Sequence, residues 1–265
     1  MALLQVAEAE VRFGGVHALR GVTLDVEPGT VTGLIGPNGA GKTTCFNAIC
    51  GLQTLAGGHI SLDGTNMHGL KPHLRARLGI ARTFQRLEIF GSLSVRENAL
   101  ASAEIRRRWS RDHSVDASSV ADEVLELVGL RALGHRPADT LPTGQARLLE
   151  LARALATKPR LLLLDEPSSG LSDSESDELG DLLIKLAAEG MGVLLVEHDM
   201  ELVMRICTRI HVLDFGAVLA AGTPAEIRSD ERVRAAYLGA SDDKEEVPTL
   251  EAGSMVAASA ARSDG

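Results

Sequence analysis

The feature that most constrains the fold is a glycine-rich octapeptide between a strand-like segment and a helical pattern. Its residues are Gly36, Pro37, Asn38, Gly39, Ala40, Gly41, Lys42 and Thr43, which fit the pattern G-x-x-x-x-G-K-[ST]. Residues 31–35 before it resemble a short apolar strand, and residues 42–51 after it have helical spacing and end at a glycine. The segment therefore predicts a strand, loop and helix unit that holds phosphate.

The chemistry of this loop predicts a site for ATP and Mg²⁺. Glycines let successive backbone N–H groups turn towards phosphate oxygens, and the helix N-terminus adds the positive end of its dipole. Lys42 supplies a point charge, the hydroxyl group of Thr43 is a ligand for Mg²⁺, and Thr44 follows in the helix. A glycine-rich turn with an incidental lysine is disfavoured, because the loop lies where the phosphate-binding mechanism requires it.

A second apolar segment ends in two acidic residues. Residues 161–164 are all leucine, and Asp165 and Glu166 follow. Asp165 is predicted to hold the water shell of Mg²⁺. Glu166 is predicted to orient and polarise the attacking water, because phosphoryl transfer needs positioning and charge stabilisation from the protein. Alone, such a pair would be a solvated strand end as often as a site, but beside the phosphate loop it predicts a hydrolase.

Composition describes a folded chain that does not grip nucleic acid. Of 265 residues, 45% are apolar, which is enough for a core; the net charge of -9 and the 3% of aromatics disfavour nucleic-acid binding. The longest apolar run, residues 217–221, is too short to cross a bilayer, and no secretory signal is visible, so we expect the chain in the cytosol. The cysteines, which are Cys45, Cys50 and Cys207, are expected to be small buried hydrophobes.

Short apolar segments alternate with helical patterns, which predicts a parallel sheet buried on both faces. The expected strands are residues 4–13, 22–26, 31–35, 59–62, 161–164, 193–196 and 210–213. Residues 93–133 are expected to be helical, and the acidic residues 240–265 are predicted to be a disordered tail.

These motifs, in this order, resemble the ATP-binding cassette family, the nucleotide-hydrolysing subunits of membrane transporters. The resemblance covers residues 4–239 and implies three further site residues: Gln85 in Arg-Thr-Phe-Gln, His198 in Glu-His-Asp and Phe13 in Arg-Phe-Gly-Gly. In the family the glutamine reaches Mg²⁺ and the attacking water, the histidine contacts the γ-phosphate and the catalytic glutamate, and the aromatic ring stacks on adenine. Outside this series, each would more often be an ordinary surface or core residue.

The signature segment departs from the family pattern. Leu141-Pro142-Thr143-Gly144-Gln145 stands where the family keeps Leu-Ser-Gly-Gly-Gln, which closes over the γ-phosphate of ATP on the opposite subunit. Pro142 has no hydroxyl group and no N–H, and Thr143 adds a β-branched side chain, while Gly144 and Gln145 are retained. Either one composite ATP site is weakened, or the retained residues and the helix N-terminus suffice.

The resemblance implies an α/β fold with a P-loop NTPase parallel-sheet core, an N-terminal antiparallel β portion and a helical subdomain at about residues 87–156, within a domain of residues 1–239. It implies integral-membrane permease subunits as partners, a second ATPase subunit, with a heterodimer favoured, and an extracytoplasmic solute-binding protein acting indirectly. Such a subunit is cytoplasmic and peripheral on the membrane. Within the family, the Arg-Thr-Phe-Gln segment and the ending Ala236-Tyr237-Leu238-Gly239 are most similar to branched-chain amino acid importers.

Other functions stay open. Similar subunits serve urea or short amides, and a related branch extracts lipopolysaccharide. A cassette protein of translation or DNA repair would need a second cassette or a long coiled coil, and the sequence has neither. A degenerate cassette that binds ATP without hydrolysis is favoured by Pro142 and Thr143 and opposed by Lys42, Asp165 and Glu166.

Overall fold

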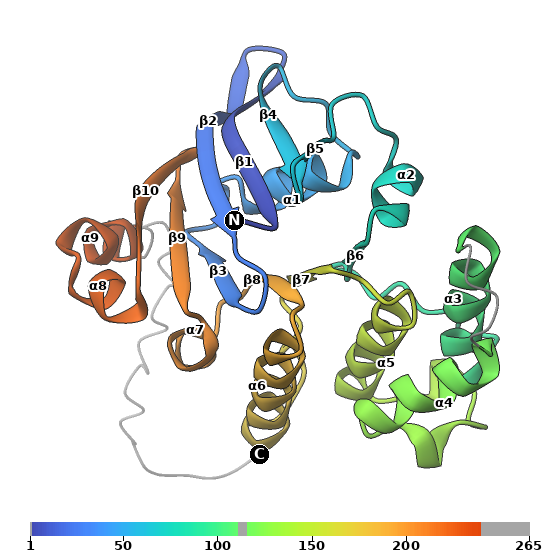
Figure 1. Ribbon diagram of the computed structural model, residues 1–265. Coiled ribbons are helices and arrows are strands. Elements are labelled where there is room, and N and C mark those ends of the chain that lie inside the picture. Colours follow the sequence, from blue (N-terminus) through green and yellow to red (C-terminus); the bar gives the residue numbers. More distant parts are fainter. Residues whose placement is uncertain (1, 111–115, 240–265) are drawn as a thin grey trace, which may run out of the picture.

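The computed structural model describes residues 2–110 and 116–239, which form two β-sheets and a set of helices (Figure 1). The strands are β1 (Leu4–Phe13), β2 (Val16–Val26), β3 (Val31–Ile35), β4 (Gly57–Leu62), β5 (Thr65–Asn66), β6 (Ile80–Arg82), β7 (Leu161–Asp165), β8 (Gly192–Val196), β9 (Arg209–Asp214) and β10 (Ala217–Gly222). The α-helices are α1 (Lys42–Cys50), α2 (Pro72–Arg77), α3 (Val95–Trp109), α4 (Ala117–Leu127), α5 (Thr143–Leu155), α6 (Asp173–Ala188), α7 (Met200–Ile206), α8 (Pro224–Ser229) and α9 (Glu231–Gly239). Two 3₁₀ turns, η1 (Arg131–Leu133) and η2 (Ala138–Thr140), precede α5.

The central sheet has the strand order β10-β9-β3-β8-β7-β6. Its strands are parallel except for β10, which pairs antiparallel with β9 at one edge. Every residue of β3, β7 and β8 is buried, as expected for parallel strands covered on both faces. The predicted parallel core is confirmed. Strands β6 and β10 were not among the predicted strands. β6 has only three residues, which is too few to show a periodic pattern, and the apolar run in β10 indicated only that the segment is too short to span a membrane.

The second sheet is antiparallel, with the order β2-β1-β4-β5. It lies above the central sheet in Figure 1 and shares a hydrophobic cluster with α1 and with one face of β3, β7 and β8. The predicted antiparallel portion is therefore confirmed. However, β2 begins at Val16 rather than at residue 22, because Phe13 and Val16 pair directly across the Gly14-Gly15 turn.

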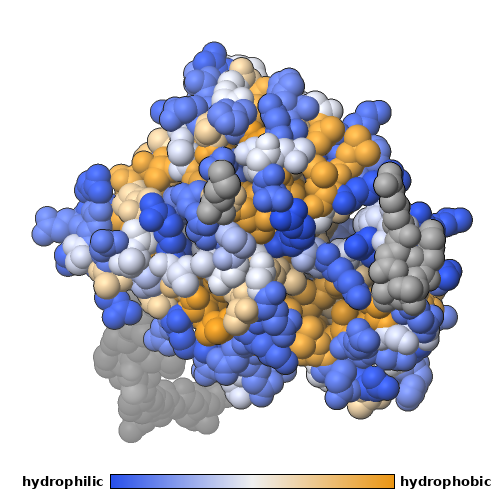
Figure 2. Space-filling model, viewed as in Figure 1, coloured by the Kyte–Doolittle hydropathy of each residue, from blue (hydrophilic) through white to orange (hydrophobic). Residues whose placement is uncertain are grey.

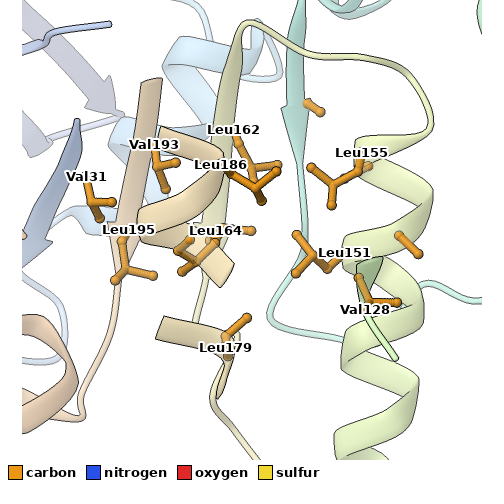
Figure 3. Close-up of a cluster of buried hydrophobic side chains, with 14 of the residues drawn as sticks. Val31, Val128, Leu151, Leu155, Leu162, Leu164, Leu179, Leu186, Val193 and Leu195 are labelled. Atoms are coloured by element: carbon orange, nitrogen blue, oxygen red, sulfur yellow. The ribbon is translucent and has the colours of Figure 1, made fainter. Parts of the chain in front are cut away.

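The other face of the central sheet packs against α6, α7 and α5 (Figure 3). In this cluster Leu162 and Leu164 of β7 and Val193 and Leu195 of β8 meet Leu179 and Leu186 of α6. Leu151 and Leu155 of α5 belong to the same cluster, so the helix that follows the signature segment is tied to the sheet through apolar contacts.

Helices α3, α4 and α5 pack on one another at one side of the molecule (Figure 1). Ser94 and Glu97 form a capping box that fixes the start of α3, and the side chain of Asp116 caps α4. Arg96 and Asp122 join the two helices through an ion pair of 2.7 Å. The expectation of helices within residues 93–133 is confirmed, whereas the predicted tail, residues 240–265, lies outside the described residues.

Within residues 2–110 and 116–239, no helix combines the length and the apolar character that a membrane span requires. Cys45 and Cys207 are buried as expected, but Cys50 is only partly buried.

Candidate nucleotide-binding site

The glycine-rich loop leaves the end of β3 and enters α1, and two of its glycines have no substitute. Gly36 and Gly41 have φ angles of 149° and 106°, in the region that disfavours residues with a side chain. A Cβ atom at Gly36 would overlap the carbonyl oxygen of Leu213, and one at Gly41 would lie 2.8 Å from the carbonyl oxygen of Ala18. The backbone of the loop is thus packed tightly against β9 and β2.

Lys42 is buried at the start of α1, and its Nζ atom donates hydrogen bonds to the carbonyl oxygens of Gly36 at 2.6 Å and Pro37 at 3.0 Å. Burial lowers the pKa of Lys42, and the nearby charges of Glu166 and Asp165 oppose this shift. The ammonium group therefore lies between the loop and the two acids. A cavity of about 440 Å³ opens here, within the usual range for small-molecule sites.

The three side chains predicted to be catalytic meet at one atom. Oε1 of Glu166 lies 2.9 Å from Nε2 of His198 and accepts a hydrogen bond of 3.4 Å from Nε2 of Gln85. Glu166 follows β7, His198 follows β8 and Gln85 follows β6, and these strands are neighbours in the central sheet. Parallel strands bring their carboxyl ends to one edge, which explains how residues so distant in sequence converge.

Glu166 has an unusual backbone, with a φ angle of 51° in the left-handed region. Its N–H donates to the carbonyl oxygen of Val196 at 2.8 Å, which ties it to β8. The buried carboxylate of Glu197 accepts hydrogen bonds from the N–H groups of Ser168 at 2.8 Å and His198 at 3.1 Å. The sequence analysis gave Glu197 no role, although it holds together the turns that carry Glu166 and His198.

The donor set suits a phosphate chain with Mg²⁺. Backbone N–H groups at the start of α1 and Lys42 suit phosphate, while the oxygen atoms of Thr43, Gln85 and Asp165 are the ligands that Mg²⁺ prefers. Most of the predicted site residues line the cavity: Asn38, Gly39, Ala40, Gly41, Lys42, Thr43, Thr44, Gln85, Asp165, Glu166 and His198. Gly36 and Pro37 do not line it, and their carbonyl oxygens accept the hydrogen bonds of Lys42 instead.

Phe13 is not among the residues that line this cavity. Its side chain lies at the end of β1 and is 51% exposed, while its pairing partner Val16 does line the cavity. His17, Arg20 and Phe215 line it as well, and the sequence analysis missed them. The correct start of β2 at Val16 would have placed His17 and Arg20 beside the phosphate loop, whereas Phe215 lies in the turn between β9 and β10.

The signature segment lies apart from the chain's own phosphate loop, because Gly144 and Gln145 belong to the first turn of α5 and do not line the cavity. Pro142 occupies the N-cap position of α5. The methyl group of Thr143 packs on Gly170, where a Cβ atom would lie 2.9 Å from it. Within the described residues, the buried Oε1 atom of Gln145 has no hydrogen-bond partner. A buried acceptor of this kind suits a contact made in an assembly.

A second cavity, of about 300 Å³, lies between the sheets and the group of helices α3, α4 and α5, which we call the helical part. We call it the groove; among its lining residues are Cys50, Arg82, Phe84, Glu88, Trp109 and Arg153. In Figure 2 the surface is mostly hydrophilic over the helices, and apolar residues gather between the helical part and the rest of the molecule.

Comparisons with known proteins agree with this geometry. A family model for ABC transporters matches residues 19–169, and a model described as branched-chain amino acid ATP-binding cassette transporter matches residues 217–243. The chain is 43% identical to the high-affinity branched-chain amino acid transport ATP-binding protein BraF of Pseudomonas aeruginosa, over 89% of this chain and 98% of that protein. It is 40% identical to LivG of Escherichia coli, which is named for the same transport, with the same coverage. It is 35% identical to the lipopolysaccharide export system ATP-binding protein LptB of Escherichia coli, over 90% of this chain and 98% of that protein.

Solved structures give the same answer for the fold. A nucleotide-free ATP-binding cassette from an ABC transporter superposes with a TM-score of 0.80 at 28% identity, over 89% of this chain and 99% of that one. A cassette in its ADP conformation has a TM-score of 0.80 at 28% identity, over 90% and 99% of the two chains. On these matches and on the site described above, the chain belongs to the ABC transporter family, in which it is an ATP-binding cassette.

Proposed function

We propose that this cassette is the ATP-hydrolysing subunit of an importer, most consistent with the import of branched-chain amino acids. The observation that carries the hydrolytic role is the convergence of Gln85 and His198 on one oxygen atom of Glu166, beside Lys42. The substrate class is supported by the names of BraF and LivG and by the model that matches residues 217–243.

In the proposed mechanism, the N–H groups of residues 38–44 and the ammonium group of Lys42 hold the phosphate chain, and the ring of Phe13 stacks on adenine. Thr43, Asp165 and Gln85 would hold Mg²⁺, which would neutralise charge on the phosphate oxygens. Glu166 orients the attacking water and polarises its O–H bond, while His198 fixes the glutamate and contacts the γ-phosphate. Hydrolysis then depends on how firmly the three side chains are held.

A second cassette completes each ATP site in this proposal. The signature segment does not line the cavity at the chain's own loop, and among the described residues the buried Oε1 atom of Gln145 has no hydrogen-bond partner. A solved relative cassette with a TM-score of 0.75 at 25% identity is described as dimeric, covering 83% of this chain and 98% of that one. We favour a heterodimer, because Pro142 and Thr143 make this signature different from the family pattern and a different partner would supply the usual one.

Permease subunits are the proposed occupants of the groove. It lies between the helical part, which we take as a subdomain of about residues 87–156, and the rest of a domain of residues 1–239. Phe84 lines the groove and is 38% exposed. Gln85 is the next residue, so a helix that docks on Phe84 would lie one residue from a side chain of the ATP site. The cassette would then act at the cytoplasmic face of the membrane, with a solute-binding protein as an indirect partner.

The test is reconstitution of the full transporter in liposomes with permease subunits and a second cassette. Uptake of radiolabelled leucine that requires ATP and is lost in the Lys42→Ala variant supports the proposal. Uptake of urea or an amide but not leucine would replace the substrate. The basal ATPase rate of the purified subunit on its own separates a degenerate cassette from an active one, because only the active one turns over ATP.

A further inference from the structure

Arg82 is a nearly buried charged side chain at the end of a strand of the central sheet. It is the last residue of β6 and pairs with Leu163 of β7, and its side chain is only 6% exposed. A guanidinium group stays protonated even when buried, so its charge and its N–H groups need partners in the protein. Where those partners lie therefore indicates what the residue does.

One partner, Asp165, lines the ATP site, and another lies on the helix that follows the phosphate loop. Nη2 of Arg82 donates to Oδ2 of Asp165 at 3.1 Å, and Nη1 donates to Oδ1 of Asn47 on α1 at 2.6 Å. The next residue, Thr83, accepts a hydrogen bond of 3.3 Å from the N–H group of Asp165 through its hydroxyl oxygen. Consecutive residues of β6 and the loop after it thus hold both the side chain and the backbone of Asp165.

Arg82 is itself held in place by aromatic rings. Its guanidinium carbon lies 5.3 Å from the ring centre of Phe46 and 4.8 Å from that of Phe84. Such contacts are favourable between a cation and a ring face, and here two rings restrict the movement of the guanidinium group. A rigid donor that binds one oxygen of a carboxylate sets the rotation of that carboxylate while the second oxygen remains available.

We propose that Arg82 is a positioning residue that holds Asp165 in the orientation in which it binds the water shell of Mg²⁺. Two effects of opposite sign are possible. The positive charge of Arg82 competes with the metal for Asp165 and weakens metal binding, whereas the fixed orientation strengthens it. The bond to a single oxygen and the rigid mounting of Arg82 make orientation the larger effect.

The same side chain joins the metal site to the groove, since both Arg82 and Phe84 line it. A partner that presses on Phe84 moves the ring against the guanidinium group and so moves Asp165. The inference rests on the assignment of Asp165 to Mg²⁺ made above, and the Asp165→Asn variant tests that assignment separately.

The experiment measures metal binding without hydrolysis, using the purified subunit, ADP and Mn²⁺ followed by electron paramagnetic resonance. In Arg82→Gln, we expect ADP affinity in the presence of EDTA to stay within about twofold of wild type, because Lys42 and the loop are intact. The affinity of the ADP complex for Mn²⁺ should fall by about tenfold or more, the usual effect of removing a group that orients a metal ligand. Arg82→Lys should lie between, because an ammonium group cannot bridge Asp165 and Asn47 as the planar fork does.

A double-mutant cycle locates the effect at Asp165. In the Asp165→Asn background, adding Arg82→Gln should lower the Mn²⁺ affinity by less than about twofold, because the carboxylate that Arg82 positions is gone. Unchanged Mn²⁺ affinity in Asp165→Asn alone would refute the metal assignment and with it the proposal, whereas a loss in Asp165→Asn without a loss in Arg82→Gln would refute the role of Arg82 alone.

Arg75→Gln is the matched control. Arg75 is also buried and lines the groove, but its hydrogen bonds go to the carbonyl oxygens of Ala48, Ile49, Met67 and Leu70. We expect it to lower thermal stability without changing Mn²⁺ affinity. Higher Mn²⁺ affinity in Arg82→Gln, unchanged affinity, or an equal loss in Arg75→Gln would each overturn the proposal.

If Arg82→Gln does not fold, two milder variants keep the test open. Asn47→Ala and Phe84→Leu each remove one support of the guanidinium group and keep its charge. Each should weaken Mn²⁺ binding by a smaller factor, of about threefold. Wild-type affinity in both would contradict the role of Arg82.

Discussion

Glu166 is held from three directions: its N–H group bonds to Val196, and its Oε1 atom meets His198 and Gln85. A side chain this constrained keeps its place when its charge is removed. Function at the residue scale can therefore be tested by substitutions that preserve shape.

Glu166→Gln should leave ATP binding close to that of wild type, because the phosphate loop and the metal ligands are unchanged. Its amide oxygen still accepts a hydrogen bond, but it cannot polarise water as a carboxylate does, so hydrolysis should slow by about 10²-fold or more. Nucleotide titration and phosphate release measure the two effects. Glu201→Gln, an exposed acid on α7, is the control, and unchanged turnover in Glu166→Gln would remove this residue from the mechanism.

His211 of β9 gives a prediction about pH. It is 2% exposed, and burial lowers its pKa below the ordinary value, with Asp25 opposing and Arg209 reinforcing the shift. Below pH of about 6.5 the unfolded chain takes up a proton that the folded chain refuses, so stability falls as the pH drops, by up to about 1.4 kcal/mol per pH unit, until the folded pKa is reached. His211→Leu should lose part of this acid sensitivity. Urea unfolding of the wild type and of His211→Leu at pH 5.5 and 7.5 measures this difference in stability. An equal pH dependence in the two proteins would contradict the role of His211.

At the scale of elements, α5 links the signature segment to the loop that carries Gln85. Arg147 donates to the carbonyl oxygens of Phe84 and Gln85, Glu150 accepts from the N–H group of Glu88 at 2.7 Å, and Arg153 donates to the carbonyl oxygen of Glu88. These three residues of α5 are spaced three positions apart, so one side of the helix holds the loop of residues 84–88, which contains Gln85.

Glu150→Ala should lower the free energy of unfolding by about 3 kcal/mol, because it removes the carboxylate that neutralises the nearly buried Arg147 and leaves the N–H group of Glu88 without its acceptor. Glu150→Gln should cost less, since it keeps an acceptor. Denaturant unfolding measures both. Glu126→Ala, which removes an exposed pair with Arg131, should change stability by less than about 1 kcal/mol, and an equal loss there would show that α5 has no special link.

Restoring the family signature by Pro142→Ser with Thr143→Gly should leave the ATPase rate of the assembled transporter within about twofold. Pro142 is already the N-cap of α5, and Gly144 and Gln145 are present. A serine at the N-cap adds about 1 kcal/mol and the loss of proline removes a similar amount, so stability should change little. The ATPase rate of the assembled transporter during transport measures the effect. A clear gain in this rate would show instead that the native signature binds ATP on the opposite subunit less well than the family pattern does.

Much of this arrangement could be predicted from the sequence, because β3, β7, β8 and the phosphate loop follow rules of strand burial and glycine geometry that act over a few neighbouring residues. The edge strands β6 and β10 were not predicted, and β6 is too short to show a periodic pattern. Arg82 and Glu197 escaped for another reason: each acts on residues that only the folded sheet brings near, and one charged residue in an apolar stretch does not name its partner.

At the scale of the whole molecule, Trp109 offers a single optical signal for motion of the helical part. It is the only tryptophan in the sequence and ends α3, with the guanidinium group of Arg77 on α2 6.0 Å from its ring centre. If ATP moves α3 relative to α2, the emission of Trp109 should shift on ATP addition. The shift should vanish in Lys42→Ala. Calorimetric binding of ATP without a change in emission would contradict the motion.

The strand order has a consequence for how the chain is made. Strand β3, which carries the phosphate loop, lies between β8 and β9, and β8 in turn separates it from β7. A ribosome therefore finishes the loop long before it makes either neighbour of β3, whereas the hairpin of β1 and β2 can close at once. Until residues 192–214 emerge, an apolar strand has no place in the sheet, and nascent chains stalled before that point should be the ones that recruit chaperones.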